Sequence, residues 1–180
     1  MEKLVERNPK IIEPRVFYDE RGFFFESFNL KNFEKEVGYS TKFVQDNHSK
    51  STKGVLRGLH YQLPPFDQGK LVRVIAGEVF DVAIDLRKSS QNLGKWFGTK
   101  LSEKNKKQFW VPEGFAHGFL VMSDQAEVLY KTTNYYNPDY EYSINWNDPK
   151  INISWPKDIE PILSLKDKNA SSFDNAKLFE

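Results

Sequence analysis

Apolar and polar residues alternate over short runs along most of this chain, which is the pattern of half-buried β-strands. Between residues 79 and 86 the even positions are all apolar, whereas the odd positions hold Val, Ala and two Asp. One face of this run is therefore apolar and the other is mixed. Residues 72–87 form two such runs around Gly77, which predicts a β-hairpin that turns at residues 76–78.

The same pattern predicts further strands, each bounded by Gly, Pro, Asn or Asp. They cover residues 23–28, 43–46, 55–62, 96–101, 108–111, 118–122 and 126–133. Short strands at such intervals are typical of a sandwich or a barrel. We therefore expect a mainly β protein with a few short peripheral helices.

One helix is predicted after residue 29. Asn29 can cap its start, Leu30, Phe33 and Val37 share one face, and Gly38 suits its end. We expect this helix to pack outside the β-structure without a chemical role.

The length of 180 residues predicts one domain, 1–180, with a β core at about 40–135 and with N-terminal strands and a C-terminal segment packed on it. Residues 155–161 are loop-like. The tail after Asn169 is polar enough that we expect it to be loosely ordered.

Composition narrows the function classes. Cys is absent, which excludes disulfides and thiolate metal sites. The charged residues 1–8 and the lack of an apolar run of ~20 residues predict a soluble cytoplasmic protein. A net charge of +1 gives no reason to expect nucleic acid or a membrane surface as a partner.

Two short motifs carry the candidate chemistry. Gly54 precedes His60 with the spacing G-x5-H, and residues 112–117 read P-x-G-x2-H and end at His117. This spacing is similar to the two-part cupin motif, in which a small β-barrel holds a metal with three His and one Glu. Here Gln62 replaces one His and Lys70 replaces the Glu. We therefore predict no metal and no cofactor, but acid–base chemistry on an organic anion.

Six ordered blocks extend this resemblance from about Glu13 to Asp167. They lie at residues 21–26, 45–49, 57–62, 68–72, 112–119 and 164–167. Together they resemble the dTDP-4-dehydrorhamnose 3,5-epimerase family. The resemblance implies a cupin-like jelly-roll β-barrel. It also implies a cofactor-free enzyme that converts dTDP-4-dehydro-6-deoxy-D-glucose to dTDP-4-dehydro-L-rhamnose, for dTDP-L-rhamnose and surface polysaccharide (O antigen) biosynthesis.

Inverting a carbon beside a ketone requires a base, a group that stabilises the enolate, and an acid. His60 is the expected base because imidazole titrates near neutral pH. Lys70 is the expected enolate stabiliser, since a cation in a water-poor cavity needs a negative partner. By resemblance, Tyr130 is the acid and Asp167 pairs with His60. Taken singly, a core His, a solvated Lys, a core Tyr and a turn Asp are the ordinary alternatives.

Arg57 suits a pyrophosphate because its planar guanidinium can grip two oxygens. Simple alternation puts Arg57 and His60 on opposite strand faces, so either Gly58 marks an irregularity or Arg57 points away. The resemblance places both in the site, and we expect the irregularity. It also implies substrate binding by several residues that are ordinary surface residues if taken singly: Arg21, Glu26, Gln45, Asn47, His117, Glu141 and Lys166.

The resemblance also implies a homodimer, in which residues 21–26 complete the neighbour's site. Only the aromatic run 23–25 supports this in the sequence, and a strand buried within one subunit would explain that run equally. Three other functions remain open. They are inversion of C3 or C5 alone on a related 4-keto sugar nucleotide, a metal-dependent cupin oxygenase, and a non-catalytic binding module. His60 and His117 alone fall short of a two-His-one-carboxylate site.

Overall fold

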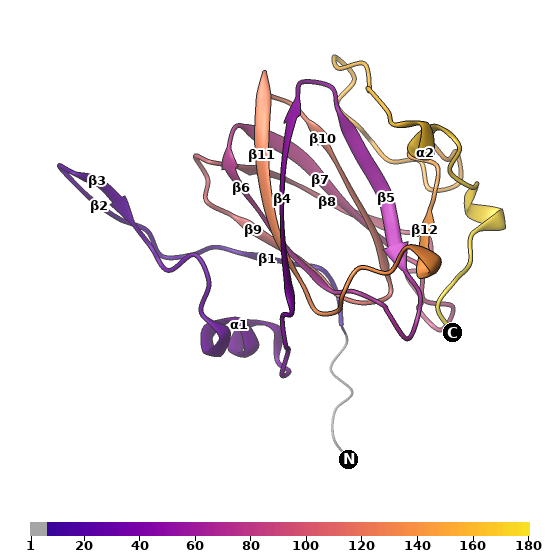
Figure 1. Ribbon diagram of the computed structural model, residues 1–180, viewed down its shortest axis with the longest axis horizontal. Helices are drawn as coiled ribbons and strands as arrows, with labels where there is room; N and C mark the ends of the chain where they lie inside the picture. Colours follow the sequence, from indigo (N-terminus) through magenta and orange to yellow (C-terminus); the bar gives the residue numbers. More distant parts are fainter. Residues whose placement is uncertain (1–6) are drawn as a thin grey trace.

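Two five-stranded antiparallel sheets form the central body of the computed structural model, which describes residues 7–180 (Figure 1). The first sheet has the order β1 (Lys10–Ile12), β9 (Gln108–Val111), β6 (Lys70–Ala76), β11 (Gln125–Thr132), β4 (Gln45–Thr52). The second has the order β12 (Glu141–Ser143), β5 (Leu56–Gln62), β10 (Phe115–Val121), β7 (Glu78–Asp85), β8 (Trp96–Ser102). The mainly β prediction is confirmed, although the strands form two separate sheets rather than a closed barrel.

The main core lies between the two sheets. Residues of both contribute to one buried cluster: Val72, Val74, Phe109, Val111, Ala126 and Val128 from the first, and Val79, Ala83, Leu101, Phe115, Phe119 and Val121 from the second. The alternation of each strand explains this, because one face of each sheet turns inward. Tyr130 packs at the margin of this cluster.

The predicted hairpin at residues 72–87 is wrong in its pairing. Both strands and the turn at Gly77 exist, but β6 pairs with β9 and β11 whereas β7 pairs with β10 and β8. The chain therefore crosses from one sheet to the other at Gly77, which has a φ of 77°. A Cβ there would lie 2.1 Å from the carbonyl oxygen of Gln125, so the corner requires glycine.

The outer face of the second sheet is covered by the C-terminal part of the chain. The apolar even positions of β7, with Leu86, pack against Ile144, Ile151 and Phe179. The expectation of a loosely ordered tail is therefore wrong: the Phe179 N–H donates to the Leu86 carbonyl at 3.0 Å, and its side chain is buried. Apolar residues spaced through the polar tail anchor it.

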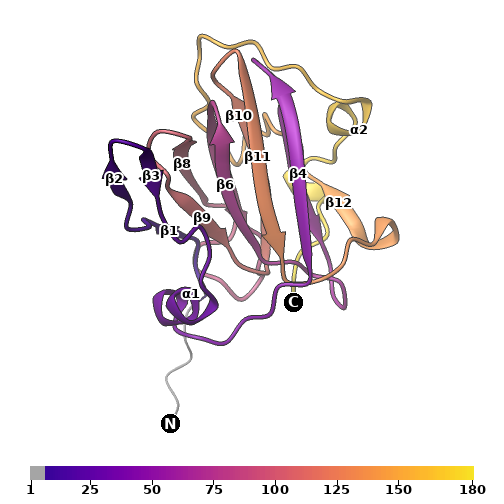
Figure 2. The ribbon, with the colours of Figure 1, turned by 60° about the vertical axis from the view of Figure 1, so that its left-hand side comes forward.

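The helix α1 (Leu30–Val37) forms as predicted and lies outside the sheets (Figure 2). The Asn29 side chain accepts a hydrogen bond from the Asn32 N–H, and Gly38 ends the helix with a φ of 86°. Phe33 packs on Trp110 of β9 with ring centroids 5.0 Å apart. No helix among residues 7–180 is long and apolar enough to cross a membrane.

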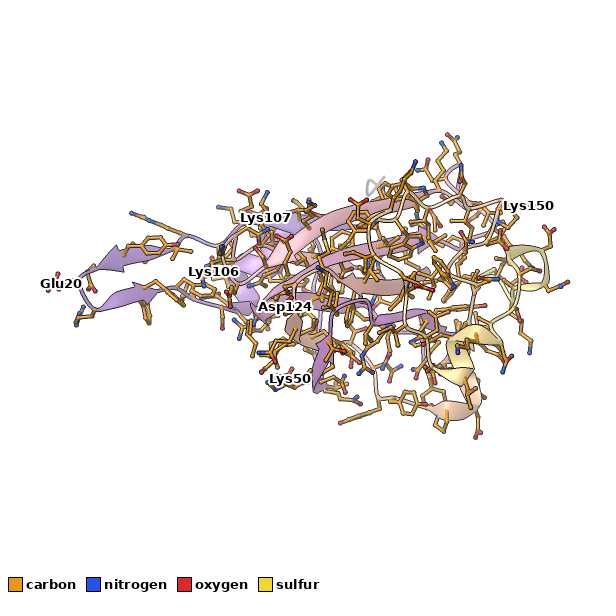
Figure 3. The ribbon with its side chains drawn as sticks, turned by 90° about the horizontal axis from the view of Figure 1, so that it is seen from above. Glu20, Lys50, Lys106, Lys107, Asp124 and Lys150 are labelled. Carbon is orange, nitrogen blue, oxygen red and sulfur yellow. The ribbon has the colours of Figure 1, made fainter. Side chains whose placement is uncertain are left out.

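A hairpin of β2 (Phe17–Asp19) and β3 (Gly22–Phe24) projects away from the sheets, with Glu20 at its tip (Figure 3). The strand predicted at 23–28 thus ends at Phe24 and belongs to this arm. Its aromatic side chains are exposed: Phe24 is 71% exposed and Phe23 is 55% exposed. The alternative of a strand buried within one subunit is therefore excluded.

Three short helical turns complete the described chain. They are η1 (Pro138–Tyr140), α2 (Leu165–Lys168) and η2 (Phe173–Asn175). The segment before α2 is tied to the second sheet, because the Leu56 N–H donates to the Ile162 carbonyl at 3.0 Å. This contact brings α2 beside β5.

Candidate active site

A cavity of about 360 Å³ opens between the two sheets. Its walls combine Arg57 and His60 of β5, Lys70 of β6, His117 of β10, Tyr130 of β11 and Asp167 of α2. Residues far apart in sequence meet there because the sheets face each other and the segment at 162–167 folds back onto β5. All four residues predicted to be catalytic line this cavity.

His60 and Asp167 form a close pair. The His60 Nε2 lies 2.6 Å from the Asp167 Oδ1, and the Asp167 side chain is 4% exposed. Burial is the largest influence on the Asp167 pKa and works to raise it. Hydrogen bonds from His60 and Ser164 outweigh burial, and the pKa lies below its ordinary value. An ionised carboxylate only accepts, so Nε2 carries the hydrogen and the free lone pair of a neutral His60 ring is on Nδ1.

Lys70 begins β6 and is buried beside His60. Its Nζ donates to the His60 carbonyl oxygen at 3.3 Å. Burial lowers the Lys70 pKa to about 8, against the opposing influence of Glu141 and Asp81. Lys70 is therefore mostly charged at neutral pH, but a small rise in pH would remove its proton.

Tyr130 faces the cavity from β11, which is in the same sheet as Lys70 and in the sheet that faces His60. Burial is the main cause that raises the pKa of its hydroxyl, and Arg57 acts in the opposite direction. The phenol is thus protonated at neutral pH. His60 and Tyr130 approach the cavity from different sheets, since β5 and β11 share no ladder.

Arg57 and His60 share the cavity because of an irregularity at Gly58. Opposite this part of β5, His117 pairs with His60 and Phe119 pairs with Arg57, so β5 holds one extra residue between the two pairs. Gly58 has a φ of 136°, and a Cβ there would lie 2.6 Å from the Gly118 Cα. The expected irregularity is confirmed, and it turns Arg57 to the side of His60.

A smaller polar pocket adjoins the cavity and shares His60, Lys70 and Tyr130 with it. Gln45 and Asn47 of β4 line this pocket, joined by a hydrogen bond of 2.9 Å between the Gln45 Nε2 and the Asn47 Oδ1. Both were predicted as substrate-binding residues. The structure therefore places their amide groups beside the catalytic candidates.

Glu141 lines this pocket and pairs with Lys166. The Lys166 Nζ lies 2.5 Å from the Glu141 Oε2, which also accepts a hydrogen bond of 2.7 Å from the Tyr136 hydroxyl. The bond to Glu141 raises the Tyr136 pKa to about 12. The pair joins α2 to β12 beside the site.

His117 is held by a second buried carboxylate. Its Nε2 lies 2.7 Å from the Asp81 Oδ1, and Asp81 is fully buried. His117 faces the same cavity and is the cross-strand neighbour of His60. The mixed face of the strand at 79–86 is thus the inward face, with Asp81 placed to fix His117.

Two predicted binding residues lie away from the cavity of their own chain. Arg21, at the tip of the projecting arm, bonds to Asp19, with the Arg21 Nε 3.1 Å from the Asp19 Oδ2. Glu26 accepts hydrogen bonds from Asn29 and Asn32 near the start of α1. Neither residue lines the catalytic cavity or the polar pocket.

Gln62 has a structural task. Its Nε2 donates to the Tyr135 carbonyl at 3.1 Å, and its Oε1 accepts from the Asn137 N–H at 2.8 Å. The side chain thereby ties the loop after β11 to β5. Within residues 7–180, no three His, Asp or Glu side chains gather as a set of metal ligands.

Sequence reasoning missed three residues around the site: Ser164, Asp81 and Tyr136. The S-x-x-D spacing from Ser164 to Asp167 is a helix-start signal that could have indicated the hydrogen bonds between them. Asp81 stood out only as an acidic residue in an otherwise buried strand. Nothing in the sequence distinguished Tyr136 from other loop aromatics.

Two facing sheets enclose a His–Asp pair, a buried Lys and a Tyr, which form a cupin-like site suited to the proton transfers of an epimerase. A model of the dTDP-4-dehydrorhamnose 3,5-epimerase family matches residues 7–175. This chain belongs to that family.

Relatives support this assignment over nearly the whole chain. A dTDP-4-dehydrorhamnose 3,5-epimerase of Shigella flexneri is 63% identical over 94% of this chain and 93% of its own length. A dTDP-6-deoxy-D-glucose-3,5-epimerase of Legionella pneumophila, solved in complex with dTDP-4-keto-L-rhamnose, has a TM-score of 0.90 at 53% identity and covers 94% of this chain and 89% of its own. A 3'-monoepimerase of Streptomyces bikiniensis, solved with dTDP-quinovose, has a TM-score of 0.89 at 32% identity, covering 94% and 85%.

Proposed function

We propose that this protein inverts C3 and C5 of dTDP-4-dehydro-6-deoxy-D-glucose to give dTDP-4-dehydro-L-rhamnose. One observation carries the proposal: His60 and Tyr130 face a single cavity from two different sheets. A proton can therefore be removed from one side of a sugar ring and returned on the other. Both C3 and C5 adjoin the C4 carbonyl, so one set of groups serves both carbons.

His60 acts as the base in this scheme. Its neutral ring takes a proton from the carbon beside the carbonyl through Nδ1, while Asp167 holds Nε2–H and stabilises the imidazolium that forms. The electron pair of the broken C–H bond moves into the ring and places negative charge on the C4 oxygen. Lys70 meets that charge with its buried ammonium.

Tyr130 acts as the acid. Its hydroxyl proton passes to the same carbon from the opposite face, which re-forms the ketone with inverted configuration. The tyrosinate then regains a proton from solvent, and His60 releases the proton that it took. No electron acceptor is required, because the sugar has the same oxidation state before and after.

The substrate-binding roles follow from position. Arg57 lies in the cavity with its Nε 3.0 Å from the Ser51 Oγ, where its outer nitrogens can meet a pyrophosphate. Gln45 and Asn47 offer both donors and acceptors in the adjoining pocket. We propose substrate contacts also for His117, Glu141 and Lys166. We further propose that the enzyme is cytoplasmic and that residues 1–180 form one epimerase domain.

The direct test is incubation with the 4-keto sugar nucleotide in heavy water, followed by NMR of positions 3 and 5. We expect deuterium at both positions and the L-rhamno configuration in the product. His60→Asn should abolish uptake at both positions, whereas His48→Asn, a change on the exposed surface, should have no effect. Normal exchange at either carbon in the His60 variant would place the base elsewhere.

A second candidate is inversion of C3 or C5 alone on a related 4-keto sugar nucleotide. The likeness to the Streptomyces bikiniensis 3'-monoepimerase favours it, because that protein shares the fold at 32% identity. The same base and acid would serve either reaction. The heavy-water product distinguishes them, since a monoepimerase leaves one of the two centres uninverted.

We further propose that the working form is a homodimer in which the projecting arm reaches the partner's site. Arg21 and Glu26 do not line the cavity of their own chain. The arm also exposes Phe17, Tyr18, Phe23 and Phe24, a set of large apolar side chains that a second copy would cover. The arm would then supply Arg21 to the phosphates, and Glu26, between the arm and α1, would meet sugar hydroxyls or a base N–H.

A further inference from the structure

The short helix α2 carries an arrangement that the reaction scheme above does not use. Ser164 is its N-cap, and the Ser164 Oγ accepts a hydrogen bond of 3.1 Å from the Asp167 N–H. The same hydroxyl donates to the Asp167 Oδ2 at 2.8 Å. In a usual capping box the third residue reaches back to the backbone N–H of the cap; here its carboxylate reaches the hydroxyl.

The two oxygens of Asp167 are thereby divided between two partners. Oδ1 faces the His60 ring and Oδ2 faces Ser164, so the carboxylate cannot rotate without breaking both contacts. Ser164 has a single hydroxyl proton, and that proton is already given to Oδ2. It cannot donate to a substrate at the same time, so any effect on the reaction must pass through Asp167.

We propose that Ser164 is a positioning residue for the catalytic base, which orients the Asp167 carboxylate toward His60 in a chain Ser164–Asp167–His60. This inference rests on the proposed role of His60. Two further contacts make the chain rigid: the Ile162 N–H donates to the Gly54 carbonyl at 2.7 Å, and Lys166 pairs with Glu141. Both contacts precede Asp167 and anchor this segment to Gly54 and β12, while the Ser164 hydroxyl fixes the orientation of the Asp167 carboxylate.

The hydroxyl also favours the charged form of a buried group. Burial alone would raise the Asp167 pKa, and the bonds from His60 and Ser164 bring it down. A carboxylate that stays ionised can stabilise the imidazolium when His60 takes a proton. Without Ser164, the carboxylate loses one of its two fixed donors and is free to turn.

Three substitutions separate this role from helix capping. Ser164→Thr keeps the donor and the cap, Ser164→Ala loses both, and Ser164→Gly loses the donor while keeping most of the stability of the helix start. We expect the Ala and Gly variants to lose about tenfold in kcat with little change in KM, as for one lost bond to a charged group. The Thr variant should stay within a few-fold of wild type. Ser172→Ala, at a cap without a side-chain bond, is the matched control.

If Ser164 only stabilises the fold, activity will follow thermal stability, and the Gly variant will be as active as wild type. That result would overturn the proposal. A double-mutant cycle adds a second readout: in an Asp167→Asn background, Ser164→Gly should lower kcat no further. An undiminished tenfold loss there would also overturn it. Full activity of His60→Asn would instead place the base of the proposed function elsewhere, so the two failures are distinguishable.

Discussion

Lys70 is 9% exposed, and its pKa of about 8 makes its charge sensitive to mild alkali. The proposed reaction requires the Lys70 ammonium, which is lost as the pH rises through the pKa. We therefore expect kcat/KM to fall above about pH 8, because this ratio reports the groups of the free enzyme. Tyr130 does not explain such a fall, since burial raises its pKa away from this range.

Lys70→Ala tests that assignment. The variant should lose roughly 10²–10³-fold in kcat, as is typical of a lost oxyanion partner. Its residual activity should show no alkaline fall near pH 8. A pH profile of kcat/KM for both proteins decides the point, and an identical alkaline limb in the two would assign the titration to another group.

Tyr130→Phe separates proton exchange from inversion. Without the phenol, His60 can still remove a proton and return a solvent deuteron on the same face. We expect the variant to retain deuterium uptake while it forms little inverted sugar, measured by NMR of the same sample. Tyr142→Phe, which removes a hydroxyl outside the cavity, should leave the ratio of inversion to exchange unchanged. An unchanged ratio in Tyr130→Phe would remove this residue from the mechanism.

The two replacements in the cupin motif lead to a prediction about metals. The Gln62 side chain is hydrogen-bonded to backbone groups of the loop after β11, so it is not free to bind a metal. The Lys70 ammonium lies beside His60 and would repel a metal cation there. We expect full epimerase activity after extensive chelation, as measured in the same NMR assay. Activity that is lost on chelation and restored by iron or zinc would contradict this prediction.

At the scale of elements, local patterns predicted the strands but not their pairing. Residues 108–111 form β9 as predicted, because this buried run is mostly apolar and Pro112 and Gly114 follow it. The hairpin at 72–87 failed because a turn at Gly77 is equally consistent with pairing and with crossing to the facing sheet. β4 extends to Thr52, beyond the predicted end at residue 46. The apolar–polar pattern missed this extension because β4 is an edge strand whose sequence is almost wholly polar.

The candidate site shows the same division. His60, Lys70 and His117 were recognisable from motif spacing, although only His60 and His117 lie on paired strands and Lys70 lies on β6 of the facing sheet. Asp167 was not, because its approach to His60 depends on the path of the C-terminal segment, which only the family resemblance indicated. The tail after residue 169 was misjudged because its few apolar residues are separated by polar ones.

Docking of the tail is itself testable. Phe179 is 8% exposed and packs in the cluster outside β7. Phe179→Ala should lower the free energy of unfolding by about 3 kcal/mol, as for other buried Phe. Leu30→Ala, at a position that is 45% exposed, should change it little. Urea denaturation measures both. Equal stability of the Phe179 variant and wild type would mean that the tail contributes nothing to folding.

The whole molecule has a body that holds one complete set of proton-transfer groups and an arm that holds Arg21, one of the proposed binding residues. Figure 3 shows how far the arm extends, with Glu20 at its end. A site that needs Arg21 is thus incomplete within one chain. In the proposed dimer, activity would require both chains, and the partner would also cover the aromatic side chains.

Complementation between inactive variants tests this requirement. Arg21→Ala and His60→Asn should each be poorly active as homodimers. In a mixed dimer, however, the chain with the intact His60 site receives an intact arm from its partner. Each isolated mixed dimer should therefore hold one complete site of two, so its activity per dimer should be about half that of wild type. The measurement is epimerase activity of the two variants co-expressed with different tags and purified by both.

The control for that experiment combines His60→Asn with Lys70→Ala. Both residues belong to the same cavity, so every site of their mixed dimer carries one defect and no activity should return. Recovery with Arg21→Ala but not with Lys70→Ala requires that the arm acts across the subunit boundary. If the Arg21 mixture also stays inactive although mixed dimers are isolated, the arm serves its own chain or none. A protein that is monomeric in sedimentation and fully active in the epimerase assay would contradict the proposal altogether, because the arm would then complete no partner's site.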